Sequence, residues 1–99
     1  MKKKNSDTNR TGMYKALLAL KTEEEAVAFM EDLCSINELK SMEQRYQVAE
    51  LLNEGRIYKD ILETTGASSA TISRVNRSLQ YGTGGYELIF DRLAGCDED

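Results

Sequence analysis

The chain has 99 residues and a formal net charge of −4, with two cysteines, no proline and no histidine, so a single domain of helices is permitted. Without histidine, and with neither cysteine in a CxxC or zinc-binding spacing, the sequence does not support an enzyme, a metal site or a cofactor. No apolar segment is long enough to span a bilayer or to act as a signal peptide, so we expect a cytoplasmic protein without a membrane partner.

The two ends of the chain are polar. Residues 1–10 are basic overall and favour a flexible tail, and residues 96–99 form a short acidic tail. The predicted domain therefore occupies residues 11–95.

Three helices are predicted in the first half of the domain. A helix over residues 12–20 is indicated by apolar residues that recur on one side. Capping-box patterns at Thr22 and Ser35, each with a glutamate three positions later, predict the starts of the second and third helices. Apolar residues at steps of three and four continue the third helix to about Asn53, and Gly55 ends it.

The stretch from Tyr58 to Arg77 has the dimensions and apolar pattern of a helix-turn-helix. Gly66 can take the left-handed conformation that ends the first helix. The apolar residues that should anchor the two helices are Ile61, Leu62, Ile72 and Val75.

A glycine-rich break at residues 81–85 is followed by a sixth predicted helix over residues 86–93, which Gly95 should end. The predicted fold class is therefore all-α. Helices this short are marginal alone, so we expect the apolar faces of the second, third and sixth helices to be buried against a second copy, in an intertwined homodimer.

Charge is distributed unevenly along the chain. Residues 1–22 carry six cations and one anion, whereas residues 23–55 carry two cations and nine anions. Residues 56–86 carry four cations and two anions, and no acid occurs between Thr64 and Tyr86. The negative net charge thus conceals a basic start and a weakly basic helix-turn-helix, both of which a nucleic acid would attract.

The second helix of the motif is suited to a DNA major groove, because its positions outside the apolar anchors are small, hydrogen-bonding or cationic. The predicted DNA contacts are Lys59, Ser68, Ser69, Ala70, Thr71, Ser73, Arg74 and Arg77. The alternative is an ordinary pair of packed helices, in which Lys59 is simply a solvated lysine. From these residues alone the two interpretations stay open.

Two arginines have further candidate roles. Arg74 could contact phosphate, hold the carboxylate of a small ligand, or pair with an acid across a dimer. Arg45 lies in sequence among Glu43, Glu50 and Glu54, so a helix-surface ion pair competes with a ligand role.

The order of elements, the segment GASSATISR and the preceding MEQRYQVAELLNEG resemble the Trp repressor superfamily, most closely its YerC/YecD-type branch. The likeness covers the chain from about Gly12 to Leu93 and is most specific from Gly66 to Ser78. It implies an all-α, six-helix subunit that interlocks with a second copy and presents two recognition helices about one turn of DNA apart. It also implies a transcriptional regulator, most simply a repressor.

In that family, tryptophan lies between an arginine of the central helix and one of the recognition helix. The resemblance matches these to Arg45 and Arg74, with Thr71 and Ser78 nearby. The family's glycine after the second arginine is Val75 here, and its side chain would occupy space that the indole needs.

We therefore expect a sequence-specific DNA-binding regulator that does not depend on tryptophan, with double-stranded DNA and a second copy as partners. Two alternatives remain. One is a regulator that senses another small, amino-acid-like effector through the same four residues, and the other is a helical dimeric interaction module without DNA affinity.

Overall fold

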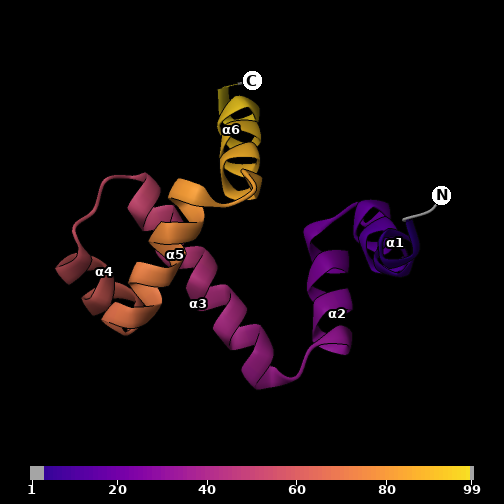
Figure 1. Cartoon of the computed structure of the whole chain (residues 1–99), viewed down its shortest axis with the longest axis horizontal. Helices are drawn as coiled ribbons and strands as arrows, with labels where there is room; N and C mark the ends of the chain where they lie inside the picture. The colour runs from indigo at the N-terminus through magenta and orange to yellow at the C-terminus, as the bar shows by residue number, and fades with distance from the viewer. Residues whose placement is uncertain (1–3, 99) are drawn as a thin grey trace. The chain divides into compact units, whose positions relative to one another are not determined.

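The computed structural model describes residues 4–98, and the burial of side chains over residues 12–95. It consists of helices joined by short connections (Figure 1). The helices are α1 (Lys4–Ala19), α2 (Glu23–Leu33), α3 (Ile36–Asn53), α4 (Tyr58–Thr65), α5 (Ser69–Tyr81) and α6 (Gly85–Glu98). No strand occurs between residues 4 and 98, and the all-α, six-helix prediction is confirmed.

The chain divides into two compact units, residues 1–39 and residues 40–99. The first unit contains α1, α2 and the first turn of α3, and the second contains the rest of α3 with α4, α5 and α6. The predicted helix-turn-helix therefore lies wholly inside the second unit.

Side-chain caps start α2 and α3 where the sequence predicts. The Thr22 hydroxyl accepts a hydrogen bond from the amide of Glu25 at 3.0 Å, and the Glu25 carboxylate accepts one from the amide of Lys21 at 2.8 Å. At α3 the pairing is reciprocal, because the Glu38 amide donates to Ser35 Oγ at 3.1 Å and the Ser35 amide donates to Glu38 Oε1 at 2.8 Å. The predicted capping box at Ser35 is confirmed in full. At Thr22 the predicted cap is confirmed, but the Glu25 carboxylate accepts from the Lys21 amide rather than from the Thr22 amide.

The first and last helices are longer than predicted. Helix α1 begins at Lys4, eight residues before the predicted start, and α6 continues to Glu98, beyond the predicted end at Leu93. The glycines that were expected to bound them, Gly12 and Gly95, both lie within helices and neither has a positive φ. Glycine weakens a helix by about 1 kcal/mol without ending it. Helical backbone thus reaches into both predicted tails, and the flexibility of those tails stays a prediction.

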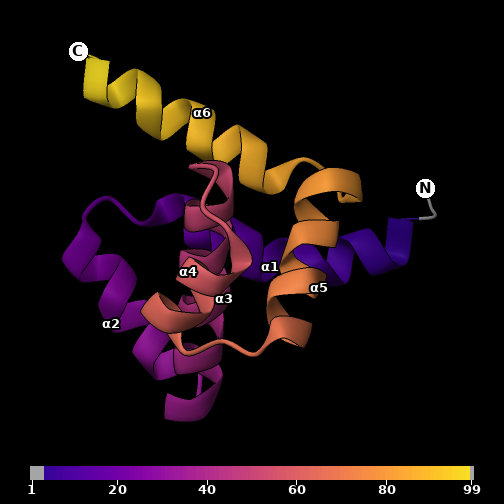
Figure 2. The ribbon, with the colours of Figure 1, turned by 90° about the vertical axis from the view of Figure 1, so that its left-hand side faces the viewer.

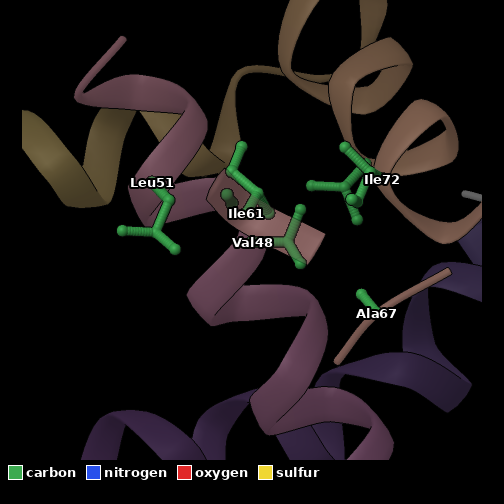
Figure 3. Close-up of a cluster of buried hydrophobic side chains, with 7 residues drawn as sticks. Val48, Leu51, Ile61, Ala67 and Ile72 are labelled. Atoms are coloured by element: carbon green, nitrogen blue, oxygen red, sulfur yellow. The ribbon is translucent and has the colours of Figure 1, made fainter. Parts of the chain in front are cut away.

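The hydrophobic core lies where α4 and α5 pack against the second half of α3 (Figure 2). In Figure 3, Val48 of α3, Ile61 of α4 and Ile72 of α5 point toward one another, with Ala67 of the α4–α5 connection beside them. The buried hydrophobic residues are Val48, Ala49, Leu51, Ile61, Ala67, Ile72 and Val75. All of them belong to the second unit.

Three of the four predicted anchors are confirmed, since Ile61, Ile72 and Val75 are each at most 2% exposed. Leu62 was predicted wrongly, because 44% of it is exposed. Consecutive helical residues point about 100° apart, so the short helix α4 turns Ile61 into the core and Leu62 away from it.

The first unit has no buried side chain among residues 12–39. Leu18 is 87% exposed and Ile36 is 75% exposed. Cys34 is half-buried. The predicted apolar faces are therefore present on α1 and α2 but are not covered inside this unit.

Candidate nucleic-acid interface

Helices α4 and α5 are joined by three residues, Gly66 to Ser68, as in a helix-turn-helix. Gly66 has φ 74°, and its amide donates to the Leu62 carbonyl at 2.9 Å. This left-handed conformation suits glycine and confirms the predicted end of α4. Ser68 then caps α5, because its Oγ accepts a hydrogen bond from the amide of Thr71 at 3.1 Å.

The end of α4 is also bonded to α3. Gln44 Nε2 donates to the carbonyl oxygen of Thr65 at 3.2 Å. The Thr65 hydroxyl donates to the Ile61 carbonyl at 2.7 Å and accepts from the Ala67 amide at 3.1 Å. Sequence reasoning missed Gln44 and Thr65, because a bond between residues 21 positions apart leaves no local pattern.

Helix α5 has one buried face and one exposed face. Ile72 and Val75 are buried and Leu79 is half-buried, so these residues hold the helix on the core. The exposed face, called the reading face below, consists of Ser69, Ala70, Ser73, Arg74 and Arg77. These five are among the predicted DNA contacts, and the spacing of helical residues places them together.

The other predicted contacts differ in their surroundings. Lys59 is exposed on α4. The hydroxyls of Ser68 and Thr71 bond to each other at 3.1 Å, and Thr71 is half-buried. Both hydroxyls are therefore engaged at the start of α5, whereas the polar side chains of the reading face point to solvent.

The cations of this region are not neutralised by neighbouring acids. Among residues 4–98, the described ion pair joins Arg56 to Glu54 at 3.7 Å, and Arg74 and Arg77 form none with the described acids. No acidic residue occurs in α5 or the connection before it. The reading face thus presents two arginines whose charge can act on an external anion.

The four predicted ligand residues do not meet in one cavity. Thr71 and Ser78 lie on the same side of α5 as Val75, which is buried between them. Arg45 is exposed and forms no ion pair with the described acids, so the ion pair considered from its sequence neighbours is not found among them. Arg74 is exposed on the reading face.

Ser78 alone of the four lines an open groove of about 570 Å³ between α3 and the start of α6. Tyr46 forms one wall, and the glycine-rich connection 82–85 forms another. The Tyr46 ring lies 6.5 Å from that of Tyr86 and 5.7 Å from that of Phe90, centroid to centroid. Burial raises the pKa of the Tyr46 hydroxyl, and the charges of Glu50 and Tyr86 raise it further.

No helix between residues 4 and 98 is long and apolar enough to cross a membrane. Over the same described part, no cluster of three or more His, Cys, Asp or Glu side chains is arranged to hold a metal ion.

These features define an all-α subunit with a helix-turn-helix arrangement of its fourth and fifth helices. Residues 10–94 match the model of the family described as Trp repressor protein, and the chain belongs to that family. The resemblance noted from GASSATISR is thereby confirmed.

Individual relatives support the same assignment. The uncharacterized protein YerC of Bacillus subtilis is 49% identical over 81 residues, which are 82% of this chain and 78% of YerC. The crystal structure of a TrpR-like protein from Eubacterium eligens superposes with a TM-score of 0.84 at 53% identity, covering 88% of this chain and 90% of that one. A Staphylococcus aureus structure gives a TM-score of 0.84 at 44% identity, covering 88% and 87% of the two chains.

Proposed function

We propose that this protein is a sequence-specific DNA-binding transcriptional regulator, acting as a repressor, that places α5 in the major groove. The observation that carries this proposal is the reading face of α5, which is exposed, acid-free and set on a buried core. Membership of the Trp repressor family supports it. Such a regulator would act in the cytoplasm, and no catalysis is proposed for it.

The proposed DNA contacts are of two kinds, contacts to phosphates and contacts to base edges. Arg77, late in α5, and Lys59, on the exposed side of α4, are assigned to phosphates. Ser69, Ala70 and Ser73 are assigned to base edges, where hydroxyl and methyl groups can approach closely. Arg74 lies between these groups on the reading face and is assigned to phosphate. Ser68 and Thr71 support the others by capping α5, and can reach DNA through bridging water.

A homodimer is part of the proposal. Large apolar side chains on α1, α2 and α6 are exposed within one chain, including Leu18, Val27, Leu88 and Leu93. Burial of these side chains against a second copy would remove their apolar surface from water, which supports the proposed homodimer. Two copies of α5 would then meet successive major grooves on one side of the duplex.

Independence from tryptophan is supported by Val75. Its side chain is 2% exposed and belongs to the hydrophobic core, on the side of α5 that also carries Thr71 and Ser78. An indole at this position would have to displace a packed side chain, and overpacking a filled site costs about 1–3 kcal/mol.

A second candidate is a regulator with a different small, amino-acid-like effector. The open groove beside Ser78 favours it, because aromatic walls and backbone groups of the glycine-rich connection could hold such a molecule. A ligand of this kind would raise the melting temperature of the protein at saturating concentration. A library of amino acids and related metabolites, screened by thermal shift, tests this candidate directly.

Selection of binding sites from random duplex DNA tests the main proposal. We expect enrichment of a two-fold symmetric sequence whose half-sites lie about one helical turn apart. Affinity for that sequence should fall steeply as the salt concentration rises, because phosphate contacts release counterions. Absence of enrichment, with no salt-dependent binding to any duplex, would leave a helical dimeric interaction module as the explanation of the fold.

A further inference from the structure

We propose that Gln44 is a positioning residue, which holds the turn between α4 and α5 against α3 and so sets the reading face without a bound ligand. The proposal rests on the proposed function, since the reading face matters only if α5 contacts DNA. It assigns a role to a side chain that does not itself belong to that face.

The first step concerns the carbonyl of Thr65. The last carbonyls of a helix have no partner inside the helix, and Thr65 is the final residue of α4. The Gly66 amide bonds to Leu62 and leaves the Thr65 oxygen to other donors. Gln44 Nε2 supplies a donor at 3.2 Å in a partly buried position, where an unpaired carbonyl would be unfavourable.

The second step concerns the Thr65 side chain. Its hydroxyl donates backward to Ile61 and accepts forward from the Ala67 amide, so one residue links the last turn of α4 to the connection. Ala67 is 2% exposed and enters the core. Because Thr65 is bonded to both α4 and the connection, the hydrogen bond from Gln44 of α3 restrains the position of the whole connection and not only that of the Thr65 carbonyl.

The third step concerns the orientation of the connection relative to α3. Apolar contacts from Val48, Ile61 and Ile72 hold the three helices together, but hydrophobic contact has no preferred direction. A hydrogen bond weakens steeply when its angle changes. Because α5 begins at Ser69, four residues after Thr65, a shift at Thr65 moves the start of the reading face.

The experiment compares Gln44→Leu and Gln44→Glu with matched changes at Gln47, an exposed residue one turn away on α3. All four variants keep good helix formers. Gln44→Leu removes the donor, and we expect affinity for the selected duplex to fall about fivefold, the effect of one ordinary hydrogen bond. The same change at Gln47 should leave affinity within about twofold of the wild type.

The pH profile separates positioning from general stability. The chain has no histidine, so wild-type affinity should change little between about pH 5.5 and 8. An ionised glutamate at position 44 would repel the Thr65 carbonyl, whereas a protonated one can donate to it. Partial burial beside the Thr65 carbonyl should raise the pKa of this glutamate above its usual value of about 4.3. Gln44→Glu should therefore bind weakly at pH 8 and begin to regain affinity as the pH falls to 5.5. Gln47→Glu introduces the same charge and should show no recovery of that size.

Hydrogen exchange provides a measurement without DNA. In Gln44→Leu, the Ala67 amide should exchange about fivefold faster than in the wild type, while amides in the middle of α3 are unchanged. Equal exchange, or wild-type DNA affinity in Gln44→Leu, would overturn the role of Gln44. Failure of the wild type to bind any duplex would instead defeat the proposed function, so the two failures are distinguishable.

Discussion

Both units of this chain carry apolar side chains on their helices, yet among residues 12–95 only those of the second unit form a buried core. In the second unit, residues 40–99, Ile61 and Ile72 are completely buried. In the first unit, Leu18 and Ile36 are mostly exposed. An apolar face therefore stabilises the fold only where the chain returns to cover it.

The connection between α4 and α5 explains the difference. Three residues with a left-handed glycine bring α5 back against α4 and α3, so three apolar faces meet. The extended cap residue Cys34 ends α2, with φ −111° and ψ 148°, and no comparable core forms among residues 12–39. The second unit thus has a buried core beneath the exposed face of α5, whereas the described side chains of the first unit are left without such a core.

The largest expected effect is on the core of the second unit. Ile72→Ala should lower the free energy of unfolding by about 2–5 kcal/mol, because it removes methyl groups from a closely packed site. Ile57→Ala, on a side chain that is 62% exposed, is the matched control and should cost less than 1 kcal/mol. Urea denaturation measures both, and equal losses would show that this core does not dominate stability.

Val75→Gly should have the next largest effect. It should lower the free energy of unfolding by about 2–4 kcal/mol, because it removes a buried side chain and places a glycine inside a helix. Ser73→Gly, on the exposed face of the same helix, should cost only about 0.5–1 kcal/mol. Calorimetric titration should show no tryptophan binding to the wild type, and detectable binding to Val75→Gly, where space opens beside Thr71 and Ser78. Tight binding to the wild type would contradict the proposed independence from tryptophan.

The first unit can be tested through its assembly. If α2 is covered by a second copy, sedimentation equilibrium should find a dimer at low micromolar concentration, with an unfolding midpoint that rises with protein concentration. Val27→Ala, on an α2 side chain that is 49% exposed within one chain, should then weaken the dimer by about 1–2 kcal/mol per subunit. Glu24→Ala, exposed on the same helix, should not. A folded wild-type monomer would show that a second copy is not needed to cover the apolar side chains of the first unit.

The reading face should give smaller, more specific effects. Arg77→Ala should weaken binding to all duplexes by about 1 kcal/mol and reduce the salt slope by about one, because we assign it to phosphate. Ser73→Ala should instead change which bases are preferred. An unaltered salt slope in Arg77→Ala would mean that α5 docks differently.

The smallest effect is expected at Tyr46. Because burial raises the pKa of its hydroxyl in the folded state, the folded protein holds the proton more tightly than the unfolded chain, in which tyrosine titrates near about 10. This contribution to stability is complete below that pH and is lost as pH rises through the folded value. Tyr46→Phe should therefore lose less stability than the wild type between pH 9 and pH 11, as measured by urea denaturation. Equal losses of stability in the wild type and in Tyr46→Phe would show that ionisation of the Tyr46 hydroxyl is not coupled to folding.

Much of the fold follows from local patterns. The caps at Thr22 and Ser35 and the glycine at Gly66 act within a few residues of themselves, so the sequence alone indicates where those helices begin or end. The lengths of the first and last helices were harder to predict from the sequence, because a glycine such as Gly95 can be tolerated within a helix or can end it.

In the candidate site too, some features could be predicted from the sequence and others could not. The small and cationic residues of α5, and the anchors Ile72 and Val75, were visible in the spacing of residues along one helix. That spacing did not reveal the exposure of Leu62, the hydrogen bond between Ser68 and Thr71, or the bond from Gln44 to Thr65.

By itself the sequence determined the helical class, the helix-turn-helix and the face of α5 that is exposed, since each depends on neighbours within about two helical turns. The tertiary structure decided which apolar faces are covered and which polar groups are already bonded. Those outcomes depend on residues that are far apart in the chain, such as Gln44 and Thr65, and a local pattern carries no record of which distant segment will lie against it.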